Sequence, residues 1–399
     1  MNHVYDVAVV GAGPGGSAAA HYLARAGLDV LLLDKSDFPR DKTCGDGLTP
    51  RALGVLQDMG ILGRLEQSAY RINGLEFISK SGKRLTAPAK TNSPYPDYLL
   101  VLPRLEMDAI IRQRALDSGA KFIGDSRVID IQEEGDPVSL LTQRGGQSIA
   151  YSARVAIVAT GANTGLLLQI GLLTQLPEPM LAVRGYFEGV RGLSDRVQIH
   201  FMDAVLPGYG WVFPISATAA NIGVGLWQVG PHKKQKPLRG SMDGFLADPL
   251  VKQQLADAKQ VGPLKSFPLR SDFVTAPTVK GRVLALGEAV GLVNPLTGEG
   301  IDFALESGRI AAEFLTGLFA QGKVNPEAIA QYDRLLRLHF QSIFRYFSLL
   351  RTMLRSPVIM QSMFTMLEKS QRVKRIAVDI LMSQPTPLEI LHLKARTVQ

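Results

Sequence analysis

The sequence contains a single cysteine, Cys44, among its 399 residues. One thiol cannot form an internal disulfide, and by itself it cannot hold zinc or an iron–sulfur cluster. The N-terminus lacks the charged start, apolar run and small-residue cleavage site of a secretory signal, which predicts a cytoplasmic protein. No run of roughly 18 or more apolar residues is free of charge, so the sequence predicts no membrane-spanning helix.

The composition is that of a folded protein. A hydrophobic share of 46% over 399 residues predicts an ample core, and the length favours two or three interlocked domains. The formal charge of +8 is uneven, because residues 321–399 carry twelve Lys or Arg against five Asp or Glu. No recognition fold accompanies this charge, so nucleic-acid binding is not predicted.

The strongest local signal is a glycine turn between an apolar strand and a helix. Residues 7–10 run into Gly11-Ala12-Gly13-Pro14-Gly15-Gly16 and then into an alanine-rich, helix-like segment. This order indicates a Rossmann-type dinucleotide site rather than an accidental glycine turn. Gly11 makes the tight turn, Gly13 lets the backbone approach a pyrophosphate, and Gly16 lets the helix pack on the strand.

Two further segments complete the predicted nucleotide site. A second strand over residues 29–33 ends at Asp34, where an acidic side chain binds ribose hydroxyls, and Lys35 follows it. Near the other end of the chain, a strand over 283–286 runs into a second glycine-rich turn. A long helix over about 301–319 follows, and it offers a second helix N-terminus to the ligand.

Three segments occur in the order found in the geranylgeranyl reductase family of flavoproteins, which the sequence resembles across roughly residues 4–315. They are Phe38 to Arg51, which contains Cys44-Gly45-Asp46-Gly47, then Pro207 to Pro214, and Asn294 to Asp302. In detail the segment around Cys44 and residues 209–214 are most similar to bacterial menaquinone reductases. The resemblance implies an FAD-dependent oxidoreductase that saturates carbon–carbon double bonds in the polyprenyl chain of a lipid or quinone.

The resemblance also implies which residues hold FAD. The pyrophosphate would lie on the first glycine turn and the adenosine ribose on Asp34, with Cys44 near the flavin. The ribityl, phosphate and ring contacts would come from Arg104, Gly287, Glu288, Gly298, Gly300 and Ile301. Two departures stand out: Glu288 replaces the usual Asp, and residues 160–163 lack an Asp-Gly pair associated with reduced nicotinamide. The electron donor therefore stays open between NAD(P)H and a ferredoxin-like protein.

The expected fold class is α/β. It has a Rossmann-type FAD-binding domain with an inserted antiparallel β-sheet substrate domain, as in aromatic hydroxylases, and a helical C-terminal region. Short β-rich runs at 182–190, 197–202, 210–215 and 221–227, joined by a hairpin at 75–85, predict the inserted sheet. The expected boundaries are 1–70, 102–180 and 276–320 for FAD binding, 71–101 and 181–275 for substrate, and 321–399 for the helices.

The predicted chemistry needs an apolar surface and an acid. Tyr209, Trp211 and Phe213 alternate along a strand, so they share one face and predict a prenyl-binding surface, with ordinary core packing as the alternative. An isolated alkene accepts hydride only if a proton is delivered with it. Cys44 is the first candidate acid, because a thiol with the ordinary pKa of about 8.5 is protonated near neutrality. Asp46 is the second, and the alternative for Cys44 is a small buried hydrophobe.

Other interpretations stay open for the C-terminal region and for the activity. The basic, amphipathic segment over residues 334–375 predicts either peripheral contact with an anionic membrane or helices packed on the flavin domain with solvated charges. The activity has two alternatives on a shared fold. One is a flavin-dependent monooxygenase or halogenase, which for halogenation needs a lysine near the substrate, and the other is a quinone-linked electron-transfer flavoprotein.

Overall fold

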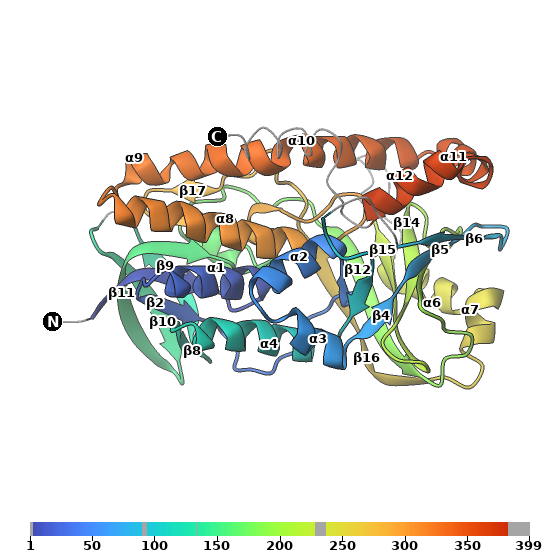
Figure 1. Ribbon diagram of the computed structural model, residues 1–399, viewed down its shortest axis with the longest axis horizontal. Helices are drawn as coiled ribbons and strands as arrows, with labels where there is room; N and C mark the ends of the chain where they lie inside the picture. The colour runs from blue at the N-terminus through green and yellow to red at the C-terminus, as the bar shows by residue number, and fades with distance from the viewer. Residues whose placement is uncertain (1–2, 90–93, 134, 228–236, 382–399) are drawn as a thin grey trace.

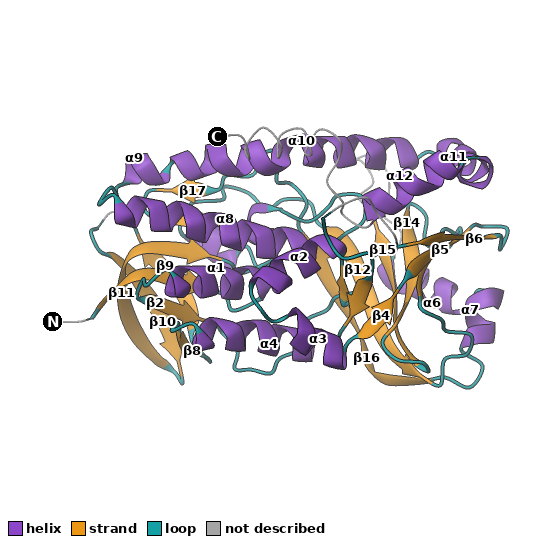
Figure 2. Ribbon diagram, in the orientation of Figure 1, coloured by secondary structure: helices purple, strands orange, loops and turns teal. Residues whose placement is uncertain are grey.

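The computed structural model describes residues 3–89, 94–133, 135–227 and 237–381. Figure 2 shows a group of strands toward each end of the molecule, with helices lying lengthwise above and between them. Within the described ranges, no helix is both long and apolar enough to cross a membrane. The parts of the predicted regions at 90–93, 228–236 and 382–399 lie outside the described residues.

The first sheet has a parallel centre, and its carboxyl edge positions the nucleotide site. Val10 at the end of one strand pairs with Leu33 and Val158, and Val158 also pairs with Ala285. The segments that follow these strands therefore meet at one edge. The order is β17 (Val279–Lys280), β18 (Val283–Ala285), β11 (Gln147–Val158), β1 (Val4–Val10), β2 (Val30–Leu33) and β8 (Lys121–Ile123), extended by β10 (Val138–Arg144) and β9 (Arg127–Gln132).

Helices α1 (Pro14–Arg25), α4 (Arg104–Asp117) and α8 (Ile301–Ala320) cover this sheet, and α1 packs against both others. The alanine-rich run expected over residues 17–26 is helical as far as Arg25, and α1 begins three residues earlier because Pro14 is suited to the first helical position. A Cβ at Gly308 of α8 would overlap the Gly15 carbonyl oxygen, so α1 and α8 meet through small residues. The Rossmann-type α/β fold is confirmed.

The second sheet contains the strands expected for the inserted domain. Its pairs are antiparallel except one: β5 pairs with β13 in parallel, so the expectation of a purely antiparallel sheet is wrong at that position. The reason is that a long stretch of chain, rather than a short hairpin turn, connects β5 to β13, and such a connection permits parallel pairing. The order is β16 (Lys259–Leu269), β12 (Met180–Glu188), β15 (Ala219–Leu226), β14 (Gly208–Pro214), β13 (Arg196–His200), β5 (Gly74–Ile78) and β6 (Arg84–Pro88).

A third, small sheet was not expected from the sequence. Strand β7 (Leu99–Val101) pairs with β3 (Gly47–Leu48) and β4 (Tyr70–Ile72), so residues 99–101 lie outside the seven-stranded sheet. The division into three regions stays a proposal. The remaining helices are α2 (Pro50–Asp58), α3 (Leu62–Ser68), α5 (Gly165–Gln169), α6 (Leu238–Leu246), α7 (Pro249–Gln254) and the 3-10 turn η1 (Gly287–Val290).

The C-terminal helices cross from one group of strands to the other. They are α9 (Pro326–Ile329), α10 (Gln331–Leu354), α11 (Pro357–Lys369) and α12 (Gln371–Leu381). Figure 1 shows α10 running lengthwise beside α8, with α11 and α12 at the end of the molecule that carries the second sheet. Buried phenylalanines attach α10 to the flavin part, since the Phe344 ring lies 5.0 Å from Phe303 and 5.3 Å from Phe273.

Candidate flavin and substrate site

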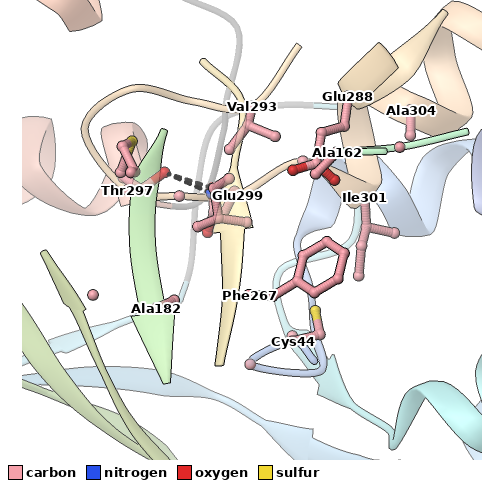
Figure 3. A pocket seen from close by; sticks show the side chains of 18 of the residues that line it. Cys44, Ala162, Ala182, Phe267, Glu288, Val293, Thr297, Glu299, Ile301 and Ala304 are labelled. Carbon is pink, nitrogen blue, oxygen red and sulfur yellow. Dashed lines mark hydrogen bonds between the residues drawn. The ribbon is translucent and has the colours of Figure 1, made fainter. Parts of the chain in front are cut away.

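A single large cavity of about 1150 Å³ joins the edge of the first sheet to the face of the second sheet. This exceeds the roughly 300–1,000 Å³ of an ordinary small-molecule pocket, which suits a cofactor together with a substrate. Figure 3 shows Cys44, Glu288, Thr297, Glu299 and Ile301 around its central part. Every site residue predicted from the sequence lines this cavity except Gly16.

The three glycines of the first turn are needed for different reasons. Gly11 has a φ of +107°, and a Cβ there would overlap the Ala159 carbonyl oxygen. A Cβ at Gly16 would overlap the Gly11 carbonyl oxygen, so Gly16 serves the packing of α1 on β1. At Gly13 the nearest atom to a Cβ would be an Arg40 guanidinium nitrogen at 3.6 Å, which leaves room inside the protein. Gly13 instead lines the cavity, where a pyrophosphate would need the space.

Asp34 is buried at the end of β2 and ties the glycine turn to that strand. Its Oδ2 accepts a 2.7 Å hydrogen bond from Ala12 N–H, and its Oδ1 accepts one of 3.0 Å from Ser36 N–H. The carboxylate keeps lone pairs free for ribose hydroxyls. Lys35 is exposed at the same end of the cavity.

Two arginines share one carboxylate beside the glycine turn. Arg104 binds Asp108 through two bonds of 2.6 and 2.8 Å, and Arg40 binds the same carboxylate at 2.9 Å. Burial acts to lower the pKa of Arg104, but Asp108, with a smaller contribution from Cys44, raises it overall. Arg104 therefore lies between the paired Asp108 and the Cys44 thiol, while Arg40 lies against Gly13.

Glu288 is buried at the second glycine turn, and other residues of the protein already donate hydrogen bonds to its carboxylate. Lys42 Nζ donates to Oε2 at 3.1 Å, and the Arg270 backbone N–H donates to Oε1 at 3.2 Å. The same Lys42 cation lies 5.2 Å from the centre of the Phe267 ring. Glu288 still lines the cavity, so a flavin contact and the Lys42 pair would share this carboxylate.

The N-terminus of α8 supplies the second helix end at the cavity. Gly300 has no side chain to cap it, and the Phe303 N–H donates to Asp302 Oδ1 at 2.8 Å, so it is the positive end of the helix dipole that this terminus offers to a ligand. Gly298 adopts a φ of +75°, and Gly298, Gly300 and Ile301 all line the cavity. Residues 160–163, which lack the Asp-Gly pair, line the wall beside Glu288.

Asp46 is fully buried and adopts a φ of 66°, in the left-handed region that side chains rarely enter. Its Oδ2 accepts hydrogen bonds from the Tyr186 hydroxyl at 2.6 Å and from Asn221 Nδ2 at 2.8 Å. Its Oδ1 has no hydrogen-bond partner in the described structure. Burial raises the pKa of Asp46 to about 6, although Tyr186 and Asn221 act to lower it. The carboxyl therefore keeps its proton to a higher pH than an ordinary aspartate does and exchanges it near pH 6.

Asn221 joins the Cys44 turn to the second sheet. Its Nδ2 donates to the Cys44 carbonyl at 2.7 Å as well as to Asp46, and its Oδ1 accepts a 2.9 Å bond from Trp211 Nε1. Cys44 itself is half-buried and lines the cavity. One buried amide thus holds both candidate acids and one aromatic ring in fixed relative positions.

The three predicted aromatic residues follow one another along β14. The Tyr209 and Trp211 rings lie 6.1 Å apart, and the Trp211 and Phe213 rings lie 6.2 Å apart. The Tyr209 hydroxyl donates to the Thr297 carbonyl. Burial raises the pKa of Tyr209, and Glu299 and Cys44 add to the effect. Because their polar atoms are bonded elsewhere, Tyr209 and Trp211 offer apolar surface to the cavity.

Sequence reasoning missed four residues of the site, namely Arg40, Lys42, Tyr186 and Asn221. Arg40 and Lys42 lie inside the matched segment beside Cys44, so their charge was a usable signal. Asn221 stands alone in the apolar run of β15, and a buried amide in such a strand needs hydrogen-bond partners. Tyr186 gave no signal, because its bond to Asp46 spans 140 residues of sequence.

These features define a flavoprotein, and residues 4–345 match the FAD binding domain family. The chain belongs to this family and, within it, to the group of menaquinone and geranylgeranyl reductases. It is 34% identical over 388 residues to a menaquinone reductase of Mycolicibacterium smegmatis, covering 96% of this chain and 92% of the relative. It is 29% identical to a digeranylgeranylglycerophospholipid reductase of Methanocaldococcus jannaschii, covering 84% and 82%. The chain is therefore an FAD-dependent oxidoreductase.

Solved structures share the fold at lower sequence identity. A geranylgeranyl bacteriochlorophyll reductase-like protein of Thermoplasma acidophilum has a TM-score of 0.83 at 22% identity, covering 99% of this chain and 100% of that protein. A flavin-dependent brominase has a TM-score of 0.76 at 21% identity, covering 95% and 94%. At these identities the likeness extends to the fold alone.

Proposed function

We propose that this protein saturates carbon–carbon double bonds in the polyprenyl chain of a lipid or of a quinone tail. One observation carries the proposal: the cavity that holds the predicted flavin residues continues into a section walled by apolar side chains. This section runs from the β14 aromatics along the second sheet to the C-terminal helices, and its walls include Phe77, Ile199, Met363 and Leu367. Such a wall fits an isoprenoid chain and offers a charged head group no partner.

The proposed reaction adds one hydrogen to each carbon of the double bond. FAD in its reduced form supplies the hydride and both electrons when it is bound. The protein supplies the proton, keeps water away and holds the chain against Tyr209, Trp211 and Phe213. Cys44 is the proposed proton donor, with Asp46 behind it as the alternative.

The role of Cys44 is tested by two substitutions. Cys44→Ala removes the acid and Cys44→Ser leaves a poorer one, so we expect both to slow product formation by roughly 10²–10⁴-fold. The measurement follows alkene reduction in a single turnover after chemical reduction of the flavin, so the donor does not limit the rate. Both variants should keep FAD. Wild-type rates in both variants would remove Cys44 from the mechanism.

The other partners are proposals as well. NAD(P)H and a ferredoxin-like protein remain the two donors, and anaerobic mixing with NADPH separates them, because direct donation bleaches the flavin. We place the protein in the cytoplasm, with peripheral contact between residues 334–375 and an anionic membrane. Three lysines line the described cavity wall, and Lys42 is bound to Glu288 and Lys265 to Asp41. Lys35 follows Asp34 at the nucleotide end, so a halogenase would find no free lysine beside the β14 aromatics within the described wall.

The experiment that tests the function is mass spectrometry of the products formed from a membrane lipid extract. Saturation adds two hydrogens for each double bond reduced. Hydroxylation adds oxygen, halogenation adds halogen, and electron transfer to a quinone leaves the tail unchanged. The quinone and lipid fractions are analysed separately, which identifies the head group. A product with added oxygen or halogen, or an unchanged tail in every fraction, would overturn the proposal.

A further inference from the structure

We infer that the polyprenyl chain reaches the flavin directly from a lipid bilayer, through a mouth formed by α10, α11 and α12. The mouth is defined by Tyr346, Met353, Ile359, Met366 and Ile376. This inference rests on the proposed function, because it names the surface from which that substrate is taken.

The mouth residues belong to two surfaces at once. Each of the five lines the cavity, and each is also between 37% and 58% exposed. Each of these large apolar side chains contacts solvent on one side and faces the cavity on the other. Such residues mark the place where an apolar channel opens to the protein surface. Exposing these side chains to water is unfavourable in free energy. Contact with an apolar phase at the mouth would remove that unfavourable contribution.

The apolar surface continues outward around the mouth. Val358 is 74% exposed and Leu349 is 59% exposed, and neither lines the cavity. With Leu338, eight of the twelve large exposed apolar residues of the described chain lie on α10, α11 and α12. The four others lie on other parts of the chain, so the exposed apolar side chains are concentrated on these three helices, whose course Figure 1 shows.

The charges beside the mouth identify the partner as an anionic leaflet. Arg345, Lys369, Arg372 and Arg375 are exposed, and none of them forms an ion pair with a described residue. Glu368, an acid on the same surface, is bound to Lys83 at 2.7 Å. Cations flanking an exposed apolar surface are the pattern of interfacial helices on anionic lipid.

The helices are also held so that they wall the cavity rather than close it. Phe364 of α11 is buried with its ring 5.3 Å from Phe201, which itself lines the cavity beside Tyr209. This contact fixes the inner face of α11, while Ile359 and Met366 on the same helix remain partly exposed. The apolar path therefore runs unbroken from the outer surface to the β14 aromatics.

The docking is tested with a fluorescent reporter at matched positions. Ile376 and Val261 are both 45% exposed, but Val261 lies on edge strand β16, away from the cavity wall. Each is replaced by Trp, and emission is followed with vesicles of phosphatidylcholine and phosphatidylglycerol carrying brominated acyl chains. We expect a blue shift and quenching for Ile376→Trp only. Equal quenching at both positions, or none at Ile376, would overturn the inference.

The passage of the chain is tested separately. Val358→Glu, on the apolar surface around the mouth but outside the cavity wall, should lower reduction of vesicle-embedded substrate by about tenfold and change reduction of detergent-dispersed substrate less than about twofold, with Val261→Glu as control. If detergent-dispersed prenyl substrate is not reduced by any form, the proposed function fails while the fluorescence result still decides the docking. If detergent-dispersed substrate is reduced but the glutamate does not change reduction of vesicle-embedded substrate, the inferred mouth is wrong and the proposed function stands.

Discussion

Gly13 allows the cofactor assignment to be tested at a single residue. Its Cβ position is free of protein backbone, so Gly13→Val should fold normally and lose FAD, because the new side chain occupies the pyrophosphate space. Gly63→Val is the matched control, since a Cβ there meets nothing within 4 Å and lies outside the cavity. The measurement is the flavin-to-protein absorbance ratio together with the unfolding midpoint. A folded Gly13→Val protein with full flavin content would refute the assignment.

Asp46 should make the stability of the protein depend on pH. Its pKa is raised from 3.8 to about 6 in the folded state, so the folded chain holds this proton more tightly than the unfolded chain. The stability that it contributes is fully present below pH 3.8 and is lost as the pH rises through 6. Asp46→Asn should therefore gain about 3 kcal/mol relative to the wild type between pH 4 and pH 7.

Urea unfolding at several pH values measures this difference, and the exposed Asp243→Asn serves as control. A wild-type-like pH dependence in Asp46→Asn would show that the carboxyl ionises normally.

The same variant also separates the two candidate acids. If Asp46 gives the proton, single-turnover reduction falls above about pH 6 in the wild type. The fall in rate above this pH is then absent from the pH–rate profile of Asp46→Asn.

At the residue scale, sequence reasoning succeeded where one residue type has one physical use. Gly11 and Gly13 could be assigned because a strand, a tight turn and a helix leave few alternatives. Glu288 is different. The sequence showed the extra methylene, but its partner Lys42 is 246 residues away, and no local pattern encodes a contact at that separation.

At the scale of elements, α10 is the connection on which the C-terminal region depends. Phe344 is fully buried among aromatic rings from two other segments, so Phe344→Ala should lower the free energy of unfolding by about 3–5 kcal/mol. Leu338→Ala on the same helix removes a side chain that is 65% exposed, and it should change stability by less than about 0.5 kcal/mol. Denaturant unfolding compares the two, and equal losses would mean that α10 is not anchored by this cluster.

Helix and strand positions were largely predictable because periodicity is local. Helix α8 begins at the expected Ile301 and ends one residue past the expected end, and β14 includes the whole expected run except Ile215. The three-stranded sheet was not predictable, because β3 has only two residues and carries no periodicity. The parallel pairing of β5 with β13 was missed for a related reason: sequence shows strands, while their partners depend on how distant segments pack.

At the scale of the whole molecule, position rather than amount of charge should govern membrane binding. The net charge of +8 does not depend on where the charged residues lie, whereas attraction to a membrane does. Arg372 and Arg375 are exposed on α12 beside the proposed mouth. Replacing both with Gln removes about 2 kcal/mol of attraction, so binding to phosphatidylglycerol vesicles should weaken roughly 25-fold. Salt should weaken wild-type binding more than it weakens that of the variant, because exposed charges are screened over about 8 Å at physiological ionic strength.

The control for this prediction removes the same charge elsewhere. Arg64 on α3 and Arg144 on β10 are exposed and lie on other elements, so their replacement by Gln leaves the same net charge as the α12 variant. If attraction followed net charge alone, both pairs of substitutions would weaken vesicle sedimentation equally. If the basic surface of α12 faces the leaflet, only Arg372→Gln with Arg375→Gln loses binding and salt sensitivity. Equal losses from the two pairs would return residues 334–375 to the other interpretation, helices packed on the flavin part with charges that are merely solvated.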